Sequence, residues 1–158
     1  MNNYLKSLLS ITLCFSSFCS FSQQIADTAK DNKEALAALN GYIDALQKLD
    51  IPKAISYCSN TPDFIVFENG KAMNYEEFTT NMRTNFPQAK KVLITSINVH
   101  VRNISANAVL ITGLYHETAT DVNDRVFDFD VITSSVLLKK DGQWKLSYVT
   151  DVVQPTSR

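Results

Sequence analysis

Two aspartates separated by one residue are the first candidates for acid–base chemistry in this chain. Asp128 and Asp130 flank Phe129, and this spacing places both carboxylates on one face of a β-strand. A carboxylate in an apolar pocket has a raised pKa and becomes a usable base near neutral pH. Asp130 precedes an apolar pair and is expected to lie deeper, so it is the first candidate base. The alternative is a solvated strand end just past a turn.

The two histidines are the next candidates, because imidazole titrates close to physiological pH. His116 ends an apolar stretch beside Tyr115 and Glu117, and it is the second candidate catalytic residue. His100 shares its strand face with polar side chains and is expected on an open surface. Nothing in the spacing of the two histidines requires a metal site, and neither a metal nor a cofactor is expected.

Four aromatic side chains are candidates for ligand contact: Tyr42, Tyr57, Tyr148 and Trp144. Tyr42 and Tyr57 lie on helix faces that are expected to turn toward a sheet. Tyr148 is expected to be in strand phase with Trp144 and Leu146. A tyrosine hydroxyl can stabilise a developing oxyanion. The alternative is core packing with the hydroxyl at a wet edge, and Trp144 is expected to be mostly buried.

Helical patterns open the part of the chain that is expected to fold. Over residues 27–49 apolar side chains recur at intervals of three and four, which predicts a helix with one buried face. Asp50 can cap a second, short helix over residues 51–58. Pro52 is tolerated there, because a residue in the first turn needs no intrahelical partner for its N–H group.

A third helix is followed by a series of strands. Asn74 and Glu77 stand in the positions of a capping box, and Pro87 is expected to end this helix. Beyond Pro87 the hydrophobic period changes from about 3.6 to about 2, which predicts β-structure. The predicted strands cover residues 64–68, 90–102, 108–118, 125–140 and 144–153. In the second of these strands, Leu93, Ile97, Val99 and Val101 are expected to share the buried side.

This order of elements predicts a single α+β domain. Three N-terminal helices are expected to pack on a curved, mainly antiparallel β-sheet that has one open face. Such a layout makes a cone with a pocket in it. The formal net charge is −1 and the chain has no basic stripe, so nucleic acid is not an expected partner.

The first 22 residues have the pattern of a cleaved signal peptide. A weakly positive start precedes an apolar run that is shorter than the roughly 20 residues of a membrane span. Ser20 and Ser22 stand at the minus-three and minus-one positions of a cut before Gln23. The mature chain, residues 23–158, is therefore expected to be periplasmic or secreted, with no stable membrane insertion. Its one remaining cysteine, Cys58, is expected to be a small buried hydrophobe rather than a nucleophile.

Three segments in this order resemble the nuclear transport factor 2-like superfamily, including its SnoaL-like polyketide-cyclase branch. They are the helix break from Leu46 to Ala54, the strand, turn and helix from Phe64 to Phe86, and the hairpin from Leu137 to Leu146. The resemblance implies a conical α+β fold that often dimerises through its sheet. Many members of the branch carry histidine at one or two alternate positions after the tryptophan, where this chain has Tyr148 and Thr150.

The superfamily contains isomerases, dehydratases, cyclases and epoxide hydrolases as well as non-catalytic members, so three hypotheses remain open. The first is an exported binding or accessory domain, homodimeric, for a small hydrophobic molecule. The second is a lyase or isomerase that uses Asp130 or His116 as base. The third is a non-catalytic dimeric interaction module with a filled cone. An apolar cavity with a buried carboxylate would favour the enzyme, and one without it would favour binding.

Overall fold

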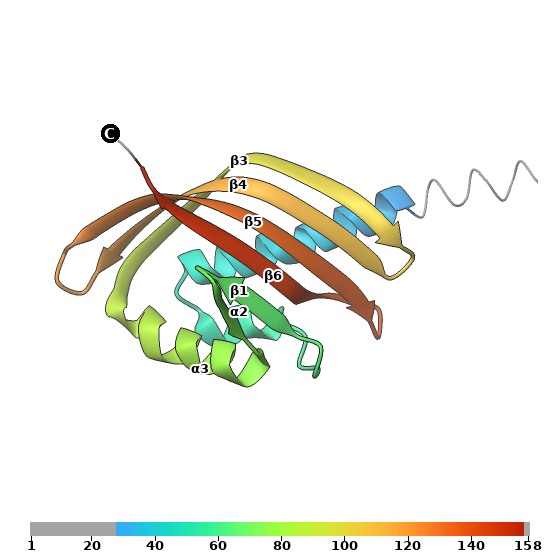
Figure 1. The fold of residues 1–158 in the computed structure, drawn as a ribbon, viewed down its shortest axis with the longest axis horizontal. Helices are drawn as coiled ribbons and strands as arrows, with labels where there is room; N and C mark the ends of the chain where they lie inside the picture. The colour runs from blue at the N-terminus through green and yellow to red at the C-terminus, as the bar shows by residue number, and fades with distance from the viewer. Residues whose placement is uncertain (1–27, 157–158) are drawn as a thin grey trace, which may run out of the picture.

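The computed structural model describes residues 28–156, in which an arched sheet covers the helices with its concave side (Figure 1). The predicted signal peptide, residues 1–22, lies outside the described residues. The prediction of an α+β fold with helices ahead of the long strands is confirmed. Within the described part, no helix combines the length and the apolar character needed to cross a membrane.

The first two helices lie under the sheet. The first covers residues 28–47 and buries its apolar face against the strands. Helix α2 spans Ile51–Ser56, and the side chain of Asp50 caps its first turn as expected. The helix ends before Cys58, because this residue forms an isolated parallel bridge with Leu146 of the sheet.

Helix α3 spans Tyr75–Asn85 and begins with the predicted capping box. Asn74 N donates to Glu77 Oε2 at 2.9 Å, and Glu77 N donates to Asn74 Oδ1 at 3.0 Å. Two of the N–H groups at the helix start are thereby satisfied. A short 3₁₀ helix, η1 (Phe86–Gln88), contains Pro87 and leads into the long strands.

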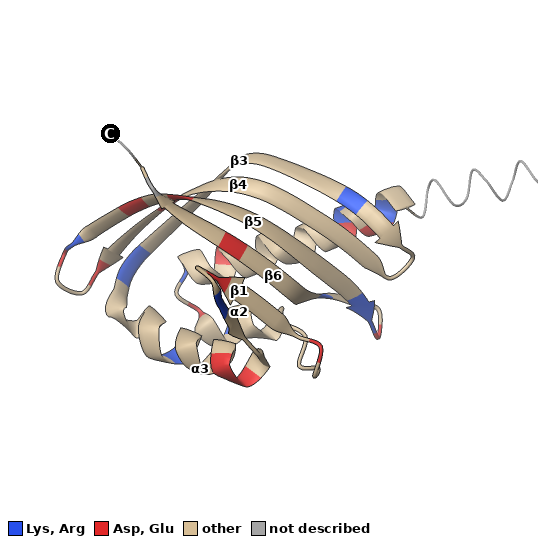
Figure 2. Cartoon of the chain, in the orientation of Figure 1, with Lys and Arg blue, Asp and Glu red and all other residues tan. Residues whose placement is uncertain are grey.

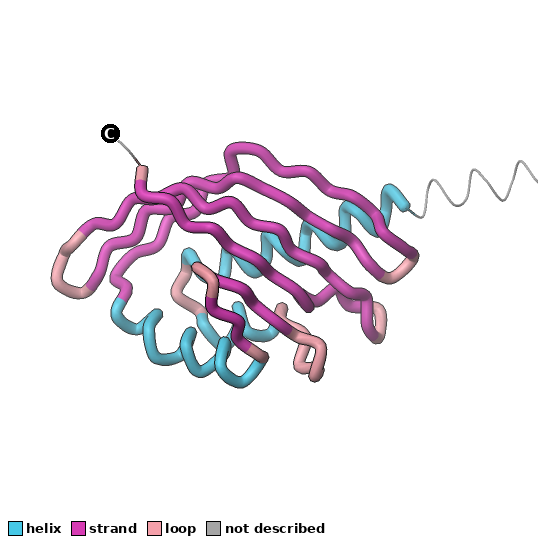
Figure 3. The backbone as a smooth tube through the Cα atoms, in the orientation of Figure 1, coloured by secondary structure: helices cyan, strands magenta, loops and turns pink. Residues whose placement is uncertain are grey.

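The sheet has six strands in the order β2-β1-β6-β5-β4-β3. Their bounds are β1 (Ile65–Glu68), β2 (Lys71–Met73), β3 (Ala89–Ser105), β4 (Ala108–Asp121), β5 (Val126–Lys140) and β6 (Gln143–Pro155). Strands β3 to β6 form an antiparallel meander, and β1 pairs with β6 in parallel. The sheet is therefore mixed. Figure 3 shows the long strands arching over the helices.

A β-bulge in β3 changes which face of the sheet each residue occupies. Ile97 is an extra residue between Ser96 and Asn98, which pair with adjacent residues of β4. The alternation therefore shifts by one position at the bulge. The prediction that Leu93 and Ile97 are buried together with Val99 and Val101 is wrong, since Leu93 is 49% and Ile97 56% exposed.

A second bulge lies in β6 and has the same effect. Ser147 is the extra residue between Leu146 and Tyr148, which pair with adjacent positions of β5. Tyr148 therefore does not share the face of Trp144 and Leu146, contrary to the prediction. Trp144 is 6% exposed, as expected, whereas Tyr148 lies on the outer face of the sheet. After the bulge, Val149 and Asp151 point toward the helices.

Candidate active site

A cavity of about 120 Å³ lies between the helices and the concave face of the sheet. Tyr42 of the first helix and Phe78 of α3 line it from one side. Tyr115 and Val149 line it from the sheet. Most of the lining is apolar, so charged groups that reach the cavity are poorly solvated. Two acidic side chains do reach it, one from β4 and one from β6.

Glu117 is the acid from β4. It pairs with Ile94 of β3 and with Phe129 of β5, and its side chain lines the cavity. Burial raises the pKa of the Glu117 carboxyl from 4.5 to about 7, and the charges of Asp151 and Glu68 act in the same direction. Glu117 is therefore divided between its two protonation states near neutral pH, which suits a group that exchanges protons.

Asp151 is the acid from β6, and it pairs with Thr133 of β5 and Glu68 of β1. Burial raises the pKa of its carboxyl from 3.8 to about 6. The charge of Glu68 adds to this rise, and a hydrogen bond with Thr133 opposes it. Asp151 Oδ1 is buried and has no hydrogen-bond partner among the described residues. This oxygen therefore has an acceptor position at the wall of the cavity that no described residue uses.

Two tyrosine hydroxyls complete the polar part of the lining. Burial raises the pKa of Tyr42 well above its ordinary value, and burial together with Asp151 raises the pKa of Tyr115. Both phenols therefore remain hydrogen-bond donors across the physiological pH range. The ring of Tyr115 lies over Gly113, where a Cβ atom would be only 2.6 Å from Tyr115 Cε2. The glycine leaves the space that this ring occupies.

The sequence contained a signal for one of the two acids only. Glu117 stands in the alternation that begins with Val109 and Ile111, the most buried residues of β4, so a strict period of 2 places it on the inner face. Asp151 would face outward if the alternation from Trp144 continued unbroken. The bulge at Ser147 turns it inward, and a bulge of this kind has no marker in the sequence.

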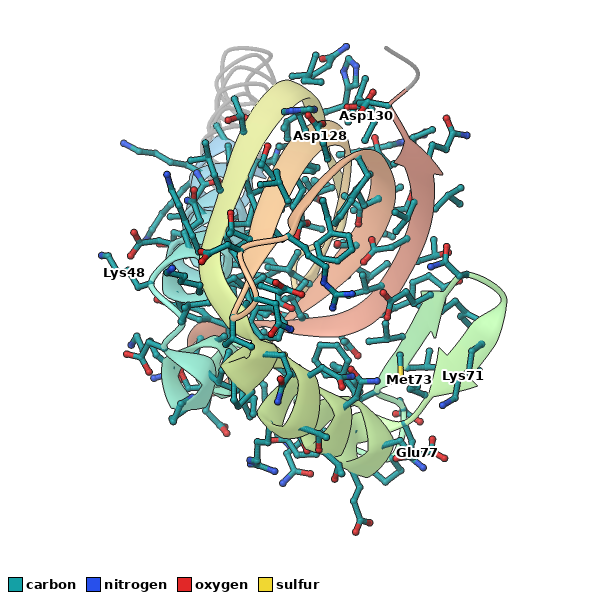
Figure 4. All side chains as sticks on the ribbon, turned by 90° about the vertical axis from the view of Figure 1, so that its left-hand side faces the viewer. Lys48, Lys71, Met73, Glu77, Asp128 and Asp130 are labelled. Atoms are coloured by element: carbon teal, nitrogen blue, oxygen red, sulfur yellow. The ribbon has the colours of Figure 1, made fainter. Side chains whose placement is uncertain are left out.

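The residues predicted to be catalytic form a separate cluster. His116 lies between two carboxylates, with Nδ1 3.0 Å from Asp130 Oδ1 and Nε2 3.3 Å from Asp128 Oδ1. Because Tyr115 and Glu117 line the cavity, His116 between them points to the opposite face of the sheet. Figure 4 shows Asp128 and Asp130 at the top of the arched sheet, with α3 below it. The cavity lining includes none of the three.

The predicted ligand-contacting aromatic residues are dispersed, and only Tyr42 lines the cavity. Tyr57 packs over Gly41 of the first helix, with Lys53 Nζ 5.2 Å from its ring centre. The ring of Tyr148 lies 6.0 Å from that of Phe67 on the outer face.

Trp144 contributes to the core rather than to the cavity. Its Nε1 donates to Glu34 Oε2 at 3.3 Å. His100, which was expected to lie on an open surface, is exposed.

Cys58 lines the cavity but is not activated. Burial raises the pKa of its thiol to about 12, so the thiol stays protonated and behaves as a small apolar group. No group of three or more His, Cys, Asp or Glu side chains in residues 28–156 is arranged to hold a metal ion.

The fold and the cavity define an α+β protein of the nuclear transport factor 2-like type. The model of the SnoaL-like domain matches residues 35–150, so the chain belongs to the SnoaL-like domain family. The resemblance to the nuclear transport factor 2-like superfamily is thereby confirmed. No curated protein is significantly similar in sequence.

Solved structures share the fold at low sequence identity. A hexachlorocyclohexane dehydrochlorinase (LinA type 2) has 14% identity and a TM-score of 0.69, over 84% of this chain and 93% of that one. A ketosteroid isomerase-like protein from Erwinia carotovora atroseptica has 18% identity and a TM-score of 0.67, over 80% and 98%. The association domain of Caenorhabditis elegans CaMKII has 20% identity and a TM-score of 0.64, over 78% and 96%.

Proposed function

We propose that this protein is an enzyme that moves a proton on a small, mainly apolar molecule held in the cavity. The observation that carries this proposal is the pair Glu117 and Asp151, two carboxyl groups with raised pKa values in one apolar cavity. A buried carboxylate is the feature that separates an enzyme of this family type from a binding domain. The names of two structural neighbours also describe proton-moving reactions, since loss of HCl and isomerisation both require a proton to leave carbon.

Burial raises the pKa values of both carboxyl groups toward neutrality, so the pair can exchange a proton with a substrate near neutral pH. In the proposed reaction Asp151, whose Oδ1 has no hydrogen-bond partner among the described residues, acts as the base. Glu117 keeps its proton and acts as the acid, while Tyr42 and Tyr115 donate hydrogen bonds to an oxygen that becomes negative.

Binding without catalysis is the second candidate function. The cavity walls are largely apolar, so they can hold a small hydrophobic molecule whether or not it reacts. In both functions the three helices and the curved sheet form the cone around the ligand.

A test of catalysis uses 5-nitrobenzisoxazole, a neutral compound whose ring opens when a base removes its C–H proton. We expect the protein to accelerate this reaction, with a rate that rises through about pH 6, and Asp151→Asn to lower kcat/KM by at least about 100-fold. Asp130→Asn is the matched variant on the other face of the sheet and should leave the rate unchanged. If Asp130→Asn loses the activity and Asp151→Asn keeps it, the assignment to the cavity is wrong.

We also propose that the mature protein is exported and forms a homodimer through the outer face of the sheet. The signal-peptide pattern of residues 1–22 supports export. Exposed apolar side chains on the outer face support the dimer, since such patches mark association surfaces. These side chains are Ile132, Leu138, Tyr148 and Val152, which are 36–50% exposed.

Native mass spectrometry of the protein recovered from an exporting bacterial host tests both points in one measurement. We expect a subunit mass that begins at Gln23 and a complex of two subunits. Ile132→Lys places a charge on the outer face and should yield monomers. A retained Met1, a lipid on a cysteine or a monomeric native protein at micromolar concentration would contradict the corresponding part of the proposal.

A further inference from the structure

The charged side chains that line the cavity are all acidic. Glu117 and Asp151 line it, and none of its lining residues is Lys, Arg or His. A third acid, Glu68, pairs with Asp151 across the parallel strands, and its charge raises the pKa values of both lining acids. Figure 2 shows acidic segments where β1 and β6 lie side by side. Lys71 of β2 pairs with Glu68 on the other side of β1, but it does not line the cavity. An anionic ligand would therefore find repulsion and no cation among the residues of the lining.

The cavity also presents acceptors and aromatic rings. Asp151 Oδ1 has no hydrogen-bond partner among the described residues, although it is buried. Four aromatic side chains line the same space: Tyr42, Phe64, Phe78 and Tyr115. The faces of aromatic rings attract cations, more strongly when water is excluded. A positively charged group in the cavity would thus lie beside a carboxyl group and aromatic side chains at once.

We propose that the ligand of this cavity carries a protonated nitrogen, and that the class of substrate is a small alkyl- or cycloalkylammonium ion. The nitrogen donates to Asp151, and the hydrocarbon part fills the apolar remainder of the cavity. This inference names the substrate class for the proposed proton transfer and rests on that function for its chemistry. The preference for a cation follows from the cavity alone.

Binding of such a cation has a consequence for protons. A positive charge beside Asp151 favours its ionised form, so this carboxyl releases its proton to solvent when the ligand enters, while Glu117 keeps its proton as the acid. The charge of Glu68, which itself pairs with Lys71 of β2, raises the pKa of Asp151 in the absence of the ligand. Affinity should therefore rise as the pH rises through the pKa of Asp151.

Isothermal titration calorimetry with three ligands of similar shape tests the inference: cyclohexylammonium, cyclohexanol and cyclohexanecarboxylate. At about pH 8 we expect the ammonium ion to bind at least about 10-fold more tightly than the alcohol, and this preference to vanish at about pH 5. Near pH 6.5, titrations in two buffers of different ionisation enthalpy should show proton release. The carboxylate should bind least tightly at about pH 8.

Two variants locate the effect. Asp151→Asn should lose the preference for the ammonium ion, whereas Asp130→Asn should keep it. Loss in Asp130→Asn instead would place the cation on the outer face and overturn the inference. Equal binding of the alcohol and the ammonium ion at about pH 8 would also overturn it. 5-Nitrobenzisoxazole is neutral, so the two proposals can fail separately. Ring opening without a preference for the ammonium ion would support the proposed function and overturn this inference. A preference for the ammonium ion without ring opening would support the inference and contradict the proposed function.

Discussion

Glu117→Gln is expected to raise the free energy of unfolding by roughly 3 kcal/mol at about pH 8 and to change it little at about pH 4. In the folded protein the pKa of Glu117 is about 7, whereas the pKa of an ordinary glutamate side chain is 4.5. Across this window the folded state binds more protons than the unfolded state, so stability falls as the pH rises. The glutamine cannot ionise, and the variant therefore avoids the loss.

Urea denaturation at several pH values checks this expectation. Asp151→Asn should likewise be more stable than the wild type at high pH, and its gain should develop over a lower pH window, from pH 3.8 to about pH 6. Asp63→Asn removes an exposed acid outside the cavity and serves as the control that should follow the wild-type curve. If Glu117→Gln also follows the wild-type curve, its carboxyl is not desolvated in the folded protein. A variant that is more stable and less active would show that the site is maintained at the expense of stability.

Trp144→Ala is expected to cost about 3–5 kcal/mol of unfolding free energy, as is typical for removal of a buried aromatic ring. The side chain is 6% exposed and belongs to the main core cluster. Its Nε1 donates to Glu34, and Lys139 Nζ lies 5.3 Å from the ring centre. Lys139 also bonds Asp31 and Glu34 at 2.9 and 3.0 Å, so the ring lies under an ion-pair network between the first helix and the sheet.

Circular dichroism in urea is the suitable measurement, because the variant lacks the single tryptophan. Trp144→Phe keeps most of the apolar area and removes only the hydrogen bond, so it should cost about 1 kcal/mol or somewhat more. The difference between the two variants separates packing from hydrogen bonding. A loss below about 1 kcal/mol in Trp144→Ala would mean that the ring is not part of the core.

Local signals in the sequence predicted the elements well. The capping box at Asn74 and Glu77 and the cap at Asp50 involve residues three positions apart, so they are readable without knowledge of the fold. The change of hydrophobic period after Pro87 placed the long strands. The parallel pairing of β1 with β6 joins residues about 80 positions apart, and nothing in the local pattern of either strand specifies it.

The candidate site was predicted less well because it depends on the phase of the strands. His116 and Asp130, the two candidate catalytic residues, are 3.0 Å apart, but the pair faces away from the cavity. Whether they have a catalytic role stays a prediction that the ring-opening assay addresses. Asp151 lies beyond the bulge at Ser147, and its orientation depends on how many residues β6 inserts against β5.

The bulge at Ser147 makes the chemistry of the cavity depend on how the strand is paired. With Ser147 outside the regular alternation, β6 shows Val149 and Asp151 to the ligand, and if Ser147 were paired regularly the same strand would show Tyr148 and Thr150. Closure of the bulge would therefore exchange an acid for a hydroxyl without altering any amino acid of the strand. In this fold a strand can thus carry two alternative sets of functional groups, one on each side, and the pairing register selects between them.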